Sequence, residues 1–570
     1  MPVDTIPFIG SPTQRGYPST ASYTAGKDQR FINFCAKLVK NPVTGKGRIK
    51  AAKRPGVSQI ASIALGSGTV VVMEPWIGNT VVGGANAGLL AIARGTTSQI
   101  LLAYTKGTSV YDLGAITGEA TGICDGKVST TPAIFISSSD STGWYYCQDA
   151  GDLNSGDIAF AGDTTNTSTT INNIASTTGM YPGQSVSGSG IPANTRIATV
   201  ASSTSITITN AATATAAGVT ITRSALAKII DADFPGNAGK SLVGTFVQLD
   251  GFLFIMDSTG AIWNSDVNSV VNWVSTSFLD AGLYPDGGVG LARVNDLIVG
   301  LGKASVEFFR NAGNTTGSPL SRINSMALNI GAINAAWIKT VGPRIFWKSR
   351  SAYGDIGIWM WAGGQARRIS TPIVEGDLQN VVGTELIFSA VHLNGYTLLT
   401  IYRVGQSRSH VYNVDLDWWS EWSGDKAVFF ASSDSATNIA VCDATSSPKY
   451  GYIANGTAGF GNALTWQDHG SAFTATIQTD KIDHGTTKRK FYKRLRLISD
   501  TVTSGGNCSV SYSDDDYASF STARTIDTSA KRKELTRLGS TEFGRAWKFE
   551  HSANAAFEVD AFEIEYEVGT

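Results

Sequence analysis

Three adjacent carboxylates, Asp514, Asp515 and Asp516, stand inside SYSDDDYASF at 511–520. Such a group could bind a cation, supply a pair of catalytic acids or form a hydrogen-bonded hairpin turn. Neighbouring side chains on a strand point to opposite faces, so adjacent acids are poorly placed to act on the same bond. Asp is common in turns because its carboxylate accepts hydrogen bonds from nearby backbone amides. We therefore expect a turn here, with the cation site and the catalytic pair as alternatives.

A second group combines acids with tryptophans in DLDWWSEW at 415–422. Tryptophan rings can stack on sugars, but they also fill the edges of packed sheets. We expect packing for the rings and hydrogen bonding at a sheet end for the acids. The residues concerned are Asp415, Asp417, Trp418, Trp419, Glu421 and Trp422.

Two segments are rich in lysine and arginine, one near each end of the chain. A cationic segment can be a solvated strand face, an interface with a partner, or a nonspecific contact with the phosphates of double-stranded DNA. No module that reads base edges is visible, so any DNA contact would be independent of sequence. The candidates for a subunit interface or for nonspecific DNA contact are Lys46, Arg48, Lys50, Lys53, Arg54, Lys488, Arg489, Lys490, Lys493 and Arg494.

Signals for enzymes and for metal sites are weak. The sequence contains no G-x-S-x-G, H-E-x-x-H, Walker loop or dinucleotide-binding glycine pattern. Its five cysteines include no C-x-x-C pair, which favours reduced, buried thiols made in a cytosol, and its five histidines are dispersed. We predict no catalytic residue, no metal, no cofactor and no enzymatic activity.

Composition favours a chain of short strands and tight turns. Of the 570 residues, 62 are glycine and 13 tryptophan, and only 16% are charged. This length suggests several domains. The net charge of −1 creates no general attraction to polyanions. No apolar run is long enough to predict a membrane span, and the first residues do not resemble a secretory signal.

The elements that must position these residues repeat along the chain. FVQLDGFLFIMDSTGAIWNSD, from 246, contains three apolar runs joined by Asp-Gly and Ser-Thr-Gly turns. VNDLIVGLGKASVEFFRN, from 294, has the same design. Such units recur every 40 to 50 residues, about five to seven times, which is typical of a β-propeller.

We predict a mainly β chain, and changes in residue composition and pattern divide it into parts. Residues 1–56 are expected to form an extended N-terminal arm, and 57–155 with 225–480 the β-propeller. The Ser/Thr/Ala-rich segment 156–224 is expected to be a small β domain inserted between two blades, although disorder is an alternative. Period-2 alternation in 481–570 predicts a C-terminal module resembling a β-sandwich.

The segment YPDGGVGLARVNDLIVGLGKASVEFFRNAGNTTGSPLSRI at 284–323 resembles the packaged-DNA stabilisation, or tail hub and nozzle, proteins of short-tailed bacteriophages. The shared features are the P-D-G turn, a pair of strands whose second strand reads S-x-E-F-F in this sequence, and a Gly-Thr-rich turn. AIWNSDVNSVVNWVSTSFLDAG at 261–282 is similar to the stretch that precedes this unit in the family. The resemblance covers most of the chain and excludes 156–224.

The resemblance implies a homo-oligomeric ring, usually a hexamer, in the virion tail below the portal and its adaptor, assembled in the host cytoplasm. Such a ring retains packaged double-stranded DNA, channels it during ejection and anchors a fibre, spike or needle protein. The alternative from another class is a tail-associated propeller that binds or degrades carbohydrate. A receptor-binding tail protein would show a long β-helical or trimeric segment, which the sequence lacks.

Overall fold

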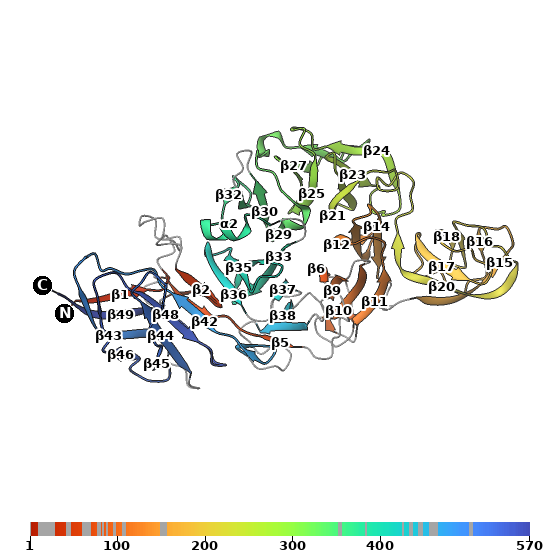
Figure 1. Cartoon of the computed structure of the whole chain (residues 1–570). Helices are drawn as coiled ribbons and strands as arrows, with labels where there is room; N and C mark the ends of the chain where they lie inside the picture. Colours follow the sequence, from red (N-terminus) through yellow and green to blue (C-terminus); the bar gives the residue numbers. More distant parts are fainter. Residues whose placement is uncertain are drawn as a thin grey trace.

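The computed structural model of the chain consists almost entirely of β-strands, as predicted (Figure 1). The residues that it describes are 2–9, 29–40, 47–59, 70–76, 81–82, 85–86, 89–94, 98–104, 110–148, 157–350, 356–381, 385–423, 427–432, 437–442, 449–454, 465–500 and 506–569.

Among these residues, seven consecutive sheets form the blades of a β-propeller. The first blade contains β6 (Val70–Trp76), β9 (Leu89–Arg94), β10 (Gln99–Tyr104) and β11 (Val110–Ala115). The second contains β12 (Ala120–Val128), β13 (Thr131–Ser138), β14 (Gly143–Cys147) and β20 (Ala216–Lys228). The third contains β21 (Leu242–Leu249), β22 (Phe252–Asp257), β23 (Ala261–Ser265) and β24 (Trp273–Asp280). The fourth contains β25 (Gly288–Val294), β26 (Leu297–Gly302), β27 (Val306–Asn311) and β28 (Leu320–Arg322). The fifth contains β29 (Ile338–Val341), β30 (Arg344–Arg350), β31 (Ile356–Trp361) and β32 (Arg367–Arg368).

The last two blades show how the ring closes. The sixth is β33 (Leu386–Leu393), β34 (Tyr396–Arg403), β35 (Arg408–Asn413) and β36 (Trp418–Ser423). The seventh joins β37 (Ala427–Ser432), β38 (Thr437–Cys442) and β39 (Lys449–Ala454) to β5 (Val57–Gln59), which comes from the other end of the propeller sequence. The first strand of each blade contacts the first strand of the next, from β6 round to β37 and back to β6. The predicted β-propeller is therefore a closed ring of sheets.

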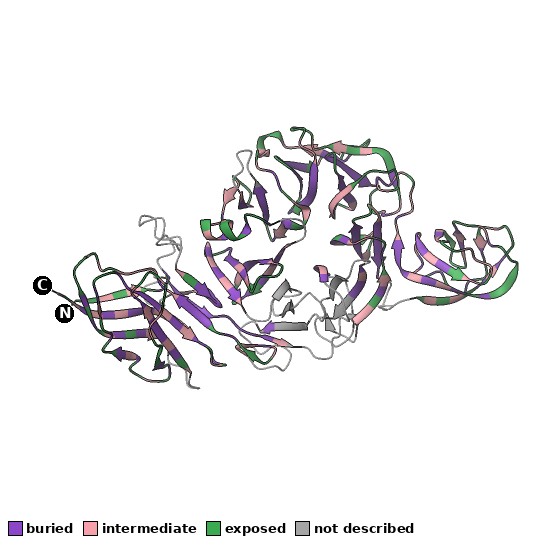
Figure 2. Cartoon of the chain, viewed as in Figure 1, coloured by how far each residue is buried: buried purple, intermediate pink, exposed green. Residues whose placement is uncertain are grey.

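Short turns build the blades, as the repeated sequences predict. Asp257 caps the turn between β22 and β23: its carboxylate accepts from the amide of Thr259 at 2.9 Å and from the indole nitrogen of Trp263 at 3.0 Å. Asp140, in the other Asp-Ser-Thr-Gly turn, accepts from the Thr142 amide at 3.1 Å. Apolar side chains pack between neighbouring blades, and many residues of the described blade strands are buried (Figure 2). Each blade is thus stabilised mainly by its neighbours.

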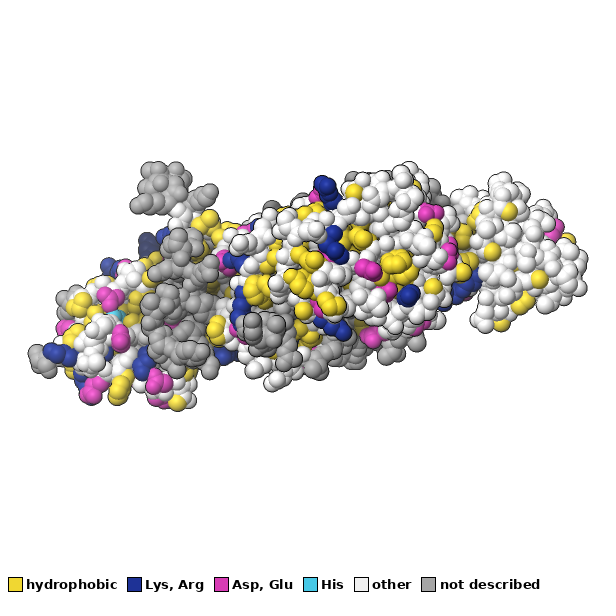
Figure 3. All heavy atoms as spheres, turned by 90° about the horizontal axis from the view of Figure 1, so that it is seen from above, with side chains coloured by type: hydrophobic (Ala, Val, Ile, Leu, Met, Phe, Trp, Pro, Cys, Tyr) yellow, Lys and Arg dark blue, Asp and Glu magenta, His cyan; other side chains and the backbone are white. Residues whose placement is uncertain are grey.

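The inserted segment lies within a blade rather than between two blades. It contains β15 (Ile158–Thr164), β16 (Thr170–Ile171), β17 (Gln184–Gly188), β18 (Ile197–Ser202) and β19 (Ser205–Ile208). The long strand β20 pairs with β15 and β17 and then, through residues 227–228, with β14 of the second blade. The predicted boundary at 224 therefore falls inside a strand. The exposed face of this part in Figure 3 carries few charged side chains.

Strands from both ends of the chain build the module that we call the terminal sandwich. One layer contains β1 (Val3–Pro7), β3 (Phe34–Lys40), β4 (Gly47–Lys53), β43 (Lys490–Ser499), β46 (Glu534–Thr536), β47 (Ser540–Thr541) and β49 (Glu558–Val568). The other contains β2 (Arg30–Ile32), β42 (Ala475–Gln478), β44 (Asn507–Ser513), β45 (Arg524–Asp527) and β48 (Ala546–His551), and β2 also pairs with β36 of the sixth blade. Phe8, Phe34, Trp547 and Phe562 lie in the core between the layers.

This arrangement corrects the prediction for residues 1–56. Their described parts are strands of the terminal sandwich and not an extended arm, because Ala51 pairs with Val559 and Ile6 with Phe562. The remaining elements are short. They are β7 (Val81–Val82), β8 (Ala85–Asn86), β40 (Gln467–Asp468), β41 (Ser471–Ala472), the helix α2 (Pro372–Leu378) and the 3-10 helices η1 (Asn324–Met326) and η2 (Ala335–Trp337). None of the helices in the described ranges is long and apolar enough to cross a membrane.

Candidate functional site

The three adjacent carboxylates each bind a different group, as expected of a turn. Asp514 forms a two-pronged ion pair with the buried Arg545, with both N···O distances at 2.7 Å. Asp515 accepts from the hydroxyls of Ser513 and Ser519 and from the Ser519 amide, and these hydrogen bonds lower its pKa to about 2. Asp516 pairs with Lys481. The three acids therefore do not converge on one point.

The acids and tryptophans of 415–422 hold the sixth blade together. Asp417 accepts from Arg367 at 2.7 Å and from the hydroxyl of Tyr412 at 2.6 Å. The Trp419 indole donates to the Ile369 carbonyl at 2.8 Å. The others contribute similar contacts: Asp415 accepts from the Thr397 amide, Glu421 pairs with Arg408, Trp418 packs on Phe31, and Trp422 is buried. The three rings lie on β36, between β35 and β2, and two of them are buried.

The basic strand β43 lies beside an acidic strand. Lys493 pairs with Glu567 at 3.0 Å and Arg494 with Glu565 at 2.9 Å, both glutamates being on β49. Lys493, Arg494 and Arg496 of β43 face outward, as predicted, but β49 places its carboxylates next to them. We call this row of ion pairs the charge ladder. The carboxylates beside these cations weaken the positive field that would attract phosphates.

Of the other candidates on this segment, Arg489 has a partner, Lys490 is buried and Lys488 is exposed. Arg489 pairs with Glu542 at 2.8 Å. Lys490 has no exposed surface, and its ammonium donates to the carbonyls of Thr486 and Glu542. The buried Lys490 cannot serve as a surface contact, which corrects its assignment.

The basic residues of the leader are mostly internal. Lys50 is 4% exposed and pairs with Asp500 at 2.8 Å, and Lys53, also 4% exposed, donates to the Ala553 carbonyl. Arg54 is 4% exposed as well. These three assignments are corrected, because the strands that carry them are covered by the C-terminal strands. Arg48 is exposed and lies 3.4 Å from Asp560, and Lys46 lies outside the described residues.

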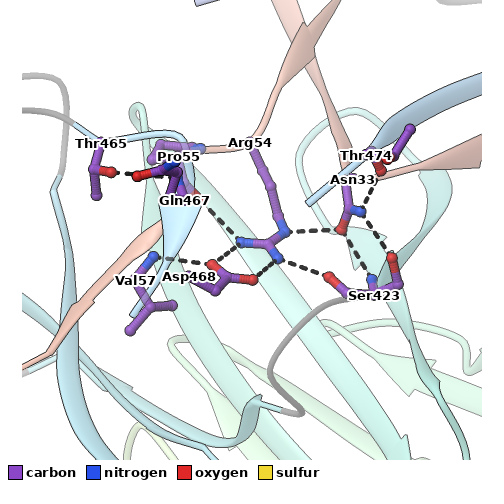
Figure 4. Close-up of polar contacts among 9 residues, drawn as sticks. All are labelled: Asn33, Arg54, Pro55, Val57, Ser423, Thr465, Gln467, Asp468 and Thr474. Carbon is purple, nitrogen blue, oxygen red and sulfur yellow. Dashed lines mark hydrogen bonds and ion pairs between the residues drawn. The ribbon is translucent and has the colours of Figure 1, made fainter. Parts of the chain in front are cut away.

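Arg54 forms the centre of a buried polar cluster that we call the junction, made of Asn33, Arg54 and Asp468 (Figure 4). The guanidinium donates to both carboxylate oxygens of Asp468, at 2.9 and 2.5 Å. It also donates to the Asn33 side chain at 2.9 Å and to the carbonyl of Ser423, at the end of β36, at 2.7 Å. The ring of Phe473 lies 4.0 Å from it. The charges of Arg54 and Asp468 therefore compensate each other inside the protein.

Each member of the junction connects different parts of the fold. Asn33, between β2 and β3, has a φ of 60°, a conformation that asparagine tolerates. Its side-chain amide donates to the Ser423 hydroxyl and to the Thr474 carbonyl. Asp468 accepts from the amide of Val57, the first residue of β5. A side chain at Gly56 would lie 2.0 Å from the Gln467 carbonyl oxygen. The junction therefore holds the strand that closes the propeller against the terminal sandwich.

Two further titratable groups lie next to the junction. Burial and the charge of Arg54 lower the pKa of Lys53 to about 8. His551 is 1% exposed, stacks on Phe557 with ring centroids 4.4 Å apart, and has no hydrogen-bond partner among the described residues. Burial and the charge of Lys53 lower the pKa of His551 to about 4. The sandwich thus contains a histidine that is held neutral.

The residues of 284–323 that carry the family resemblance lock a surface loop. Asp286 accepts from the amide of Ala304 at 2.6 Å and from the hydroxyl of Ser305 at 3.0 Å. Glu307, 1% exposed, accepts from the Leu283 amide at 2.9 Å and pairs with Arg322 at 2.6 Å. The acids of this segment fix backbone geometry, which is a structural role.

Sequence reasoning missed the junction and a third cationic segment. Arg54 and Asp468 are more than 400 residues apart, so no local pattern connects them. The third segment, AKRKELTRL at 530–538, did carry a signal, with four cations and one acid. In the described part of the chain no cluster of His, Cys, Asp or Glu is suited to a metal, and Cys35, Cys124 and Cys508 are free thiols.

The closed ring of sheets defines a β-propeller. Residues 162–399 match the family model described as Bacteriophage P22 Gp10, beta-propeller. This match confirms the resemblance of the chain to the packaged-DNA stabilisation proteins, over the residues matched. The match begins inside 156–224, so it does not support excluding that segment from the resemblance. No curated protein matches the sequence.

Solved structures share only a general likeness. Raptor from Chaetomium thermophilum is 10% identical with a TM-score of 0.35; the match covers 70% of this chain but only 29% of the Raptor chain. A chain of the mitotic checkpoint complex is 11% identical with a TM-score of 0.33, covering 77% and 98%. An exo-β-1,3-galactanase from Phanerochaete chrysosporium is 10% identical with a TM-score of 0.21, covering 57% and 95%. These low scores carry no argument about function.

Proposed function

We propose that the chain is a virion protein of the tail of a short-tailed bacteriophage. In this proposal several copies, six in the family's usual arrangement, form a tail hub or nozzle ring below the portal and its adaptor. The ring retains the packaged DNA and channels it during ejection, and it anchors a fibre, spike or needle protein. The observation that carries the proposal is the match of residues 162–399 to the P22 Gp10 family.

The architecture supports a mechanical role. The propeller is closed by β5, and the junction fixes this strand to the terminal sandwich. Head-to-tail contacts between rigid subunits close into a ring when their rotation permits. A net charge of −1 also suits a channel through which DNA must slide, because a strongly basic lumen would hold the phosphates.

The oligomeric state and the position in the particle test this proposal. Native mass spectrometry of the purified chain should give a ring of several copies, and incubation with bacterial surface polysaccharide should release no fragments. Phage particles made without the chain should lose packaged DNA and end at the adaptor. A monomer that cleaves a saccharide would favour the carbohydrate-active alternative. Particles that keep a complete tail without this chain would refute the proposal.

A further inference from the structure

One edge of the terminal sandwich carries exposed cations that have no ion-pair partner among the described residues. At this edge the last strands of the two layers, β45 and β46, come together. Arg524, Lys531, Arg532 and Arg537 are exposed here, and we call these four residues the basic edge. No ion pair joins any of the four to the rest of the described structure. Their charge therefore faces the solvent.

The basic edge differs from the charge ladder because of its place in the sheet. β43 has the acidic strand β49 on one side, so its cations meet glutamates. β46 is the last strand on the other side of β43, and no further described strand supplies carboxylates there. Two acids belong to β45 and β46 themselves: Asp527 accepts from the amide and hydroxyl of Ser529, and Glu534 lies 3.8 Å from Arg494.

The edge is also held in a fixed shape. Arg524 donates to the carbonyls of Thr536 and Arg537, at 2.6 and 3.3 Å, and so ties β45 to β46. The amide of Arg537 donates to the Lys493 carbonyl at 3.1 Å. From Arg532 to Arg537 an extended chain spans about 17 Å. Each strand of duplex DNA presents a charge about every 3.4 Å of helix axis, so this length faces roughly five phosphates.

We propose that the basic edge is the surface through which the chain contacts the phosphate backbone of packaged double-stranded DNA. The inference rests on the proposed function and moves the DNA contact away from the segment 488–494, where the sequence had suggested it. The contact is made to phosphates only and is independent of base sequence, because backbone contacts position a protein without reading bases. The few cations per copy leave the DNA free to slide, while a ring of copies multiplies their number.

The surroundings of the basic edge favour DNA over an acidic protein. Protein interfaces depend on exposed aromatic or aliphatic anchors. Between residues 506 and 541 no large hydrophobic side chain is exposed in the described structure; the exposed Phe491 and Phe543 lie at and beyond the β47 end of this layer. The exposed neighbours include one acid, Asp527, and small hydroxyl residues, Thr525, Ser529 and Thr536, which are of the kind that donate to phosphate oxygens.

A salt titration with matched variants tests this proposal. The full chain is titrated against a fluorescent 30-base-pair duplex at several NaCl concentrations, and anisotropy gives the binding constant. The test variant is Lys531→Gln/Arg532→Gln/Arg537→Gln, which keeps Arg524 because its hydrogen bonds hold the edge together. The control, Lys240→Gln/Lys303→Gln/Arg310→Gln, removes the same charge from exposed propeller positions. Equal thermal unfolding curves would show that both variants fold.

The test variant should bind at least ten-fold more weakly in 100 mM salt, and its plot of log K against log salt should be less steep by about 3. The control should keep the wild-type slope. Equal losses in both variants, an unchanged test variant, or no binding by the wild type would overturn the inference. Weaker binding of polyglutamate with unchanged DNA binding would overturn it in favour of an acidic protein. None of these outcomes bears on ring formation, which native mass spectrometry measures separately.

Discussion

Breaking the ion pair of the junction should loosen the closure of the propeller. The substitution Asp468→Asn keeps the size of the side chain but removes its charge. The carboxylate of Asp468 accepts from two guanidinium nitrogens and from the Val57 amide. An amide in its place has one acceptor oxygen, and its own NH₂ group would face a donor of Arg54. The variant would therefore leave a buried guanidinium without its counter-charge.

The expected cost follows from this burial. The side chains of Arg54 and Asp468 are 4% and 2% exposed, so water cannot replace the lost partner. Removing one member of a buried pair costs about 3–5 kcal/mol, whereas an exposed pair contributes about 0–1 kcal/mol. The penalty should appear as easier opening of β5 and β40, because Asp468 belongs to β40 and binds the first amide of β5. A cost of 3–5 kcal/mol corresponds to an opening constant about 10² to 10⁴ times larger.

Native-state hydrogen exchange measures this opening directly. The amides of Gly56, Val57 and His469 are all hydrogen-bonded across the junction, so their exchange should accelerate by the same factor. The control Glu565→Gln, which breaks a rung of the exposed charge ladder, should change these rates by less than about ten-fold. If Asp468→Asn changed them no more than this control, the junction would not hold the closing strand and the reasoning would be refuted.

Three further predictions concern the same module. Gly56→Ala should reduce the free energy of unfolding by about 3 kcal/mol or more, because the new Cβ would lie 2.0 Å from a carbonyl oxygen of β40. The midpoint of thermal unfolding should therefore fall, and an unchanged midpoint would contradict this prediction. His551 stays neutral in the fold down to about pH 4, whereas the unfolded chain takes up a proton below about pH 6.5. Stability should therefore fall by up to about 3 kcal/mol between these values, and His551→Phe should flatten the pH dependence of the urea midpoint. Burial raises the pKa of Cys35 and Cys508 to about 12, so iodoacetamide at pH 8 should label them in urea but not in buffer.

Local patterns in the sequence were enough to predict the propeller and the C-terminal half of the sandwich. The Asp-Ser-Thr-Gly turns at 140–143 and 257–260 are short-range signals, and the alternation in β43 and β49 indicates one buried face. The N-terminal strands could not be assigned in this way. Ala51 pairs with Val559 across some 500 residues, and a strand pattern does not specify a distant partner.

The candidate site shows the same limit for individual side chains. Alternation predicted correctly that Arg494 faces outward, yet no local pattern places Glu565 beside it until the two strands are paired. Lys50 and Lys53 look equally exposed in the sequence, but each contacts a residue about 450 to 500 positions further along the chain, namely Asp500 and Ala553. Charge counted along a segment therefore overestimates the charge that a partner meets.

The topology makes the complete chain a condition for both closures. β5 must reach β39 to close the propeller, and β4 must reach β49 to complete the sandwich, and both strands belong to the first 60 residues. Arg54 lies between these two strands, and its partner Asp468 precedes the last strands of the sandwich. Contacts between such distant segments form late because the entropy of closing the intervening loop must first be overcome. We infer that a chain lacking either end can neither close its propeller nor cover the apolar face of β3 and β4.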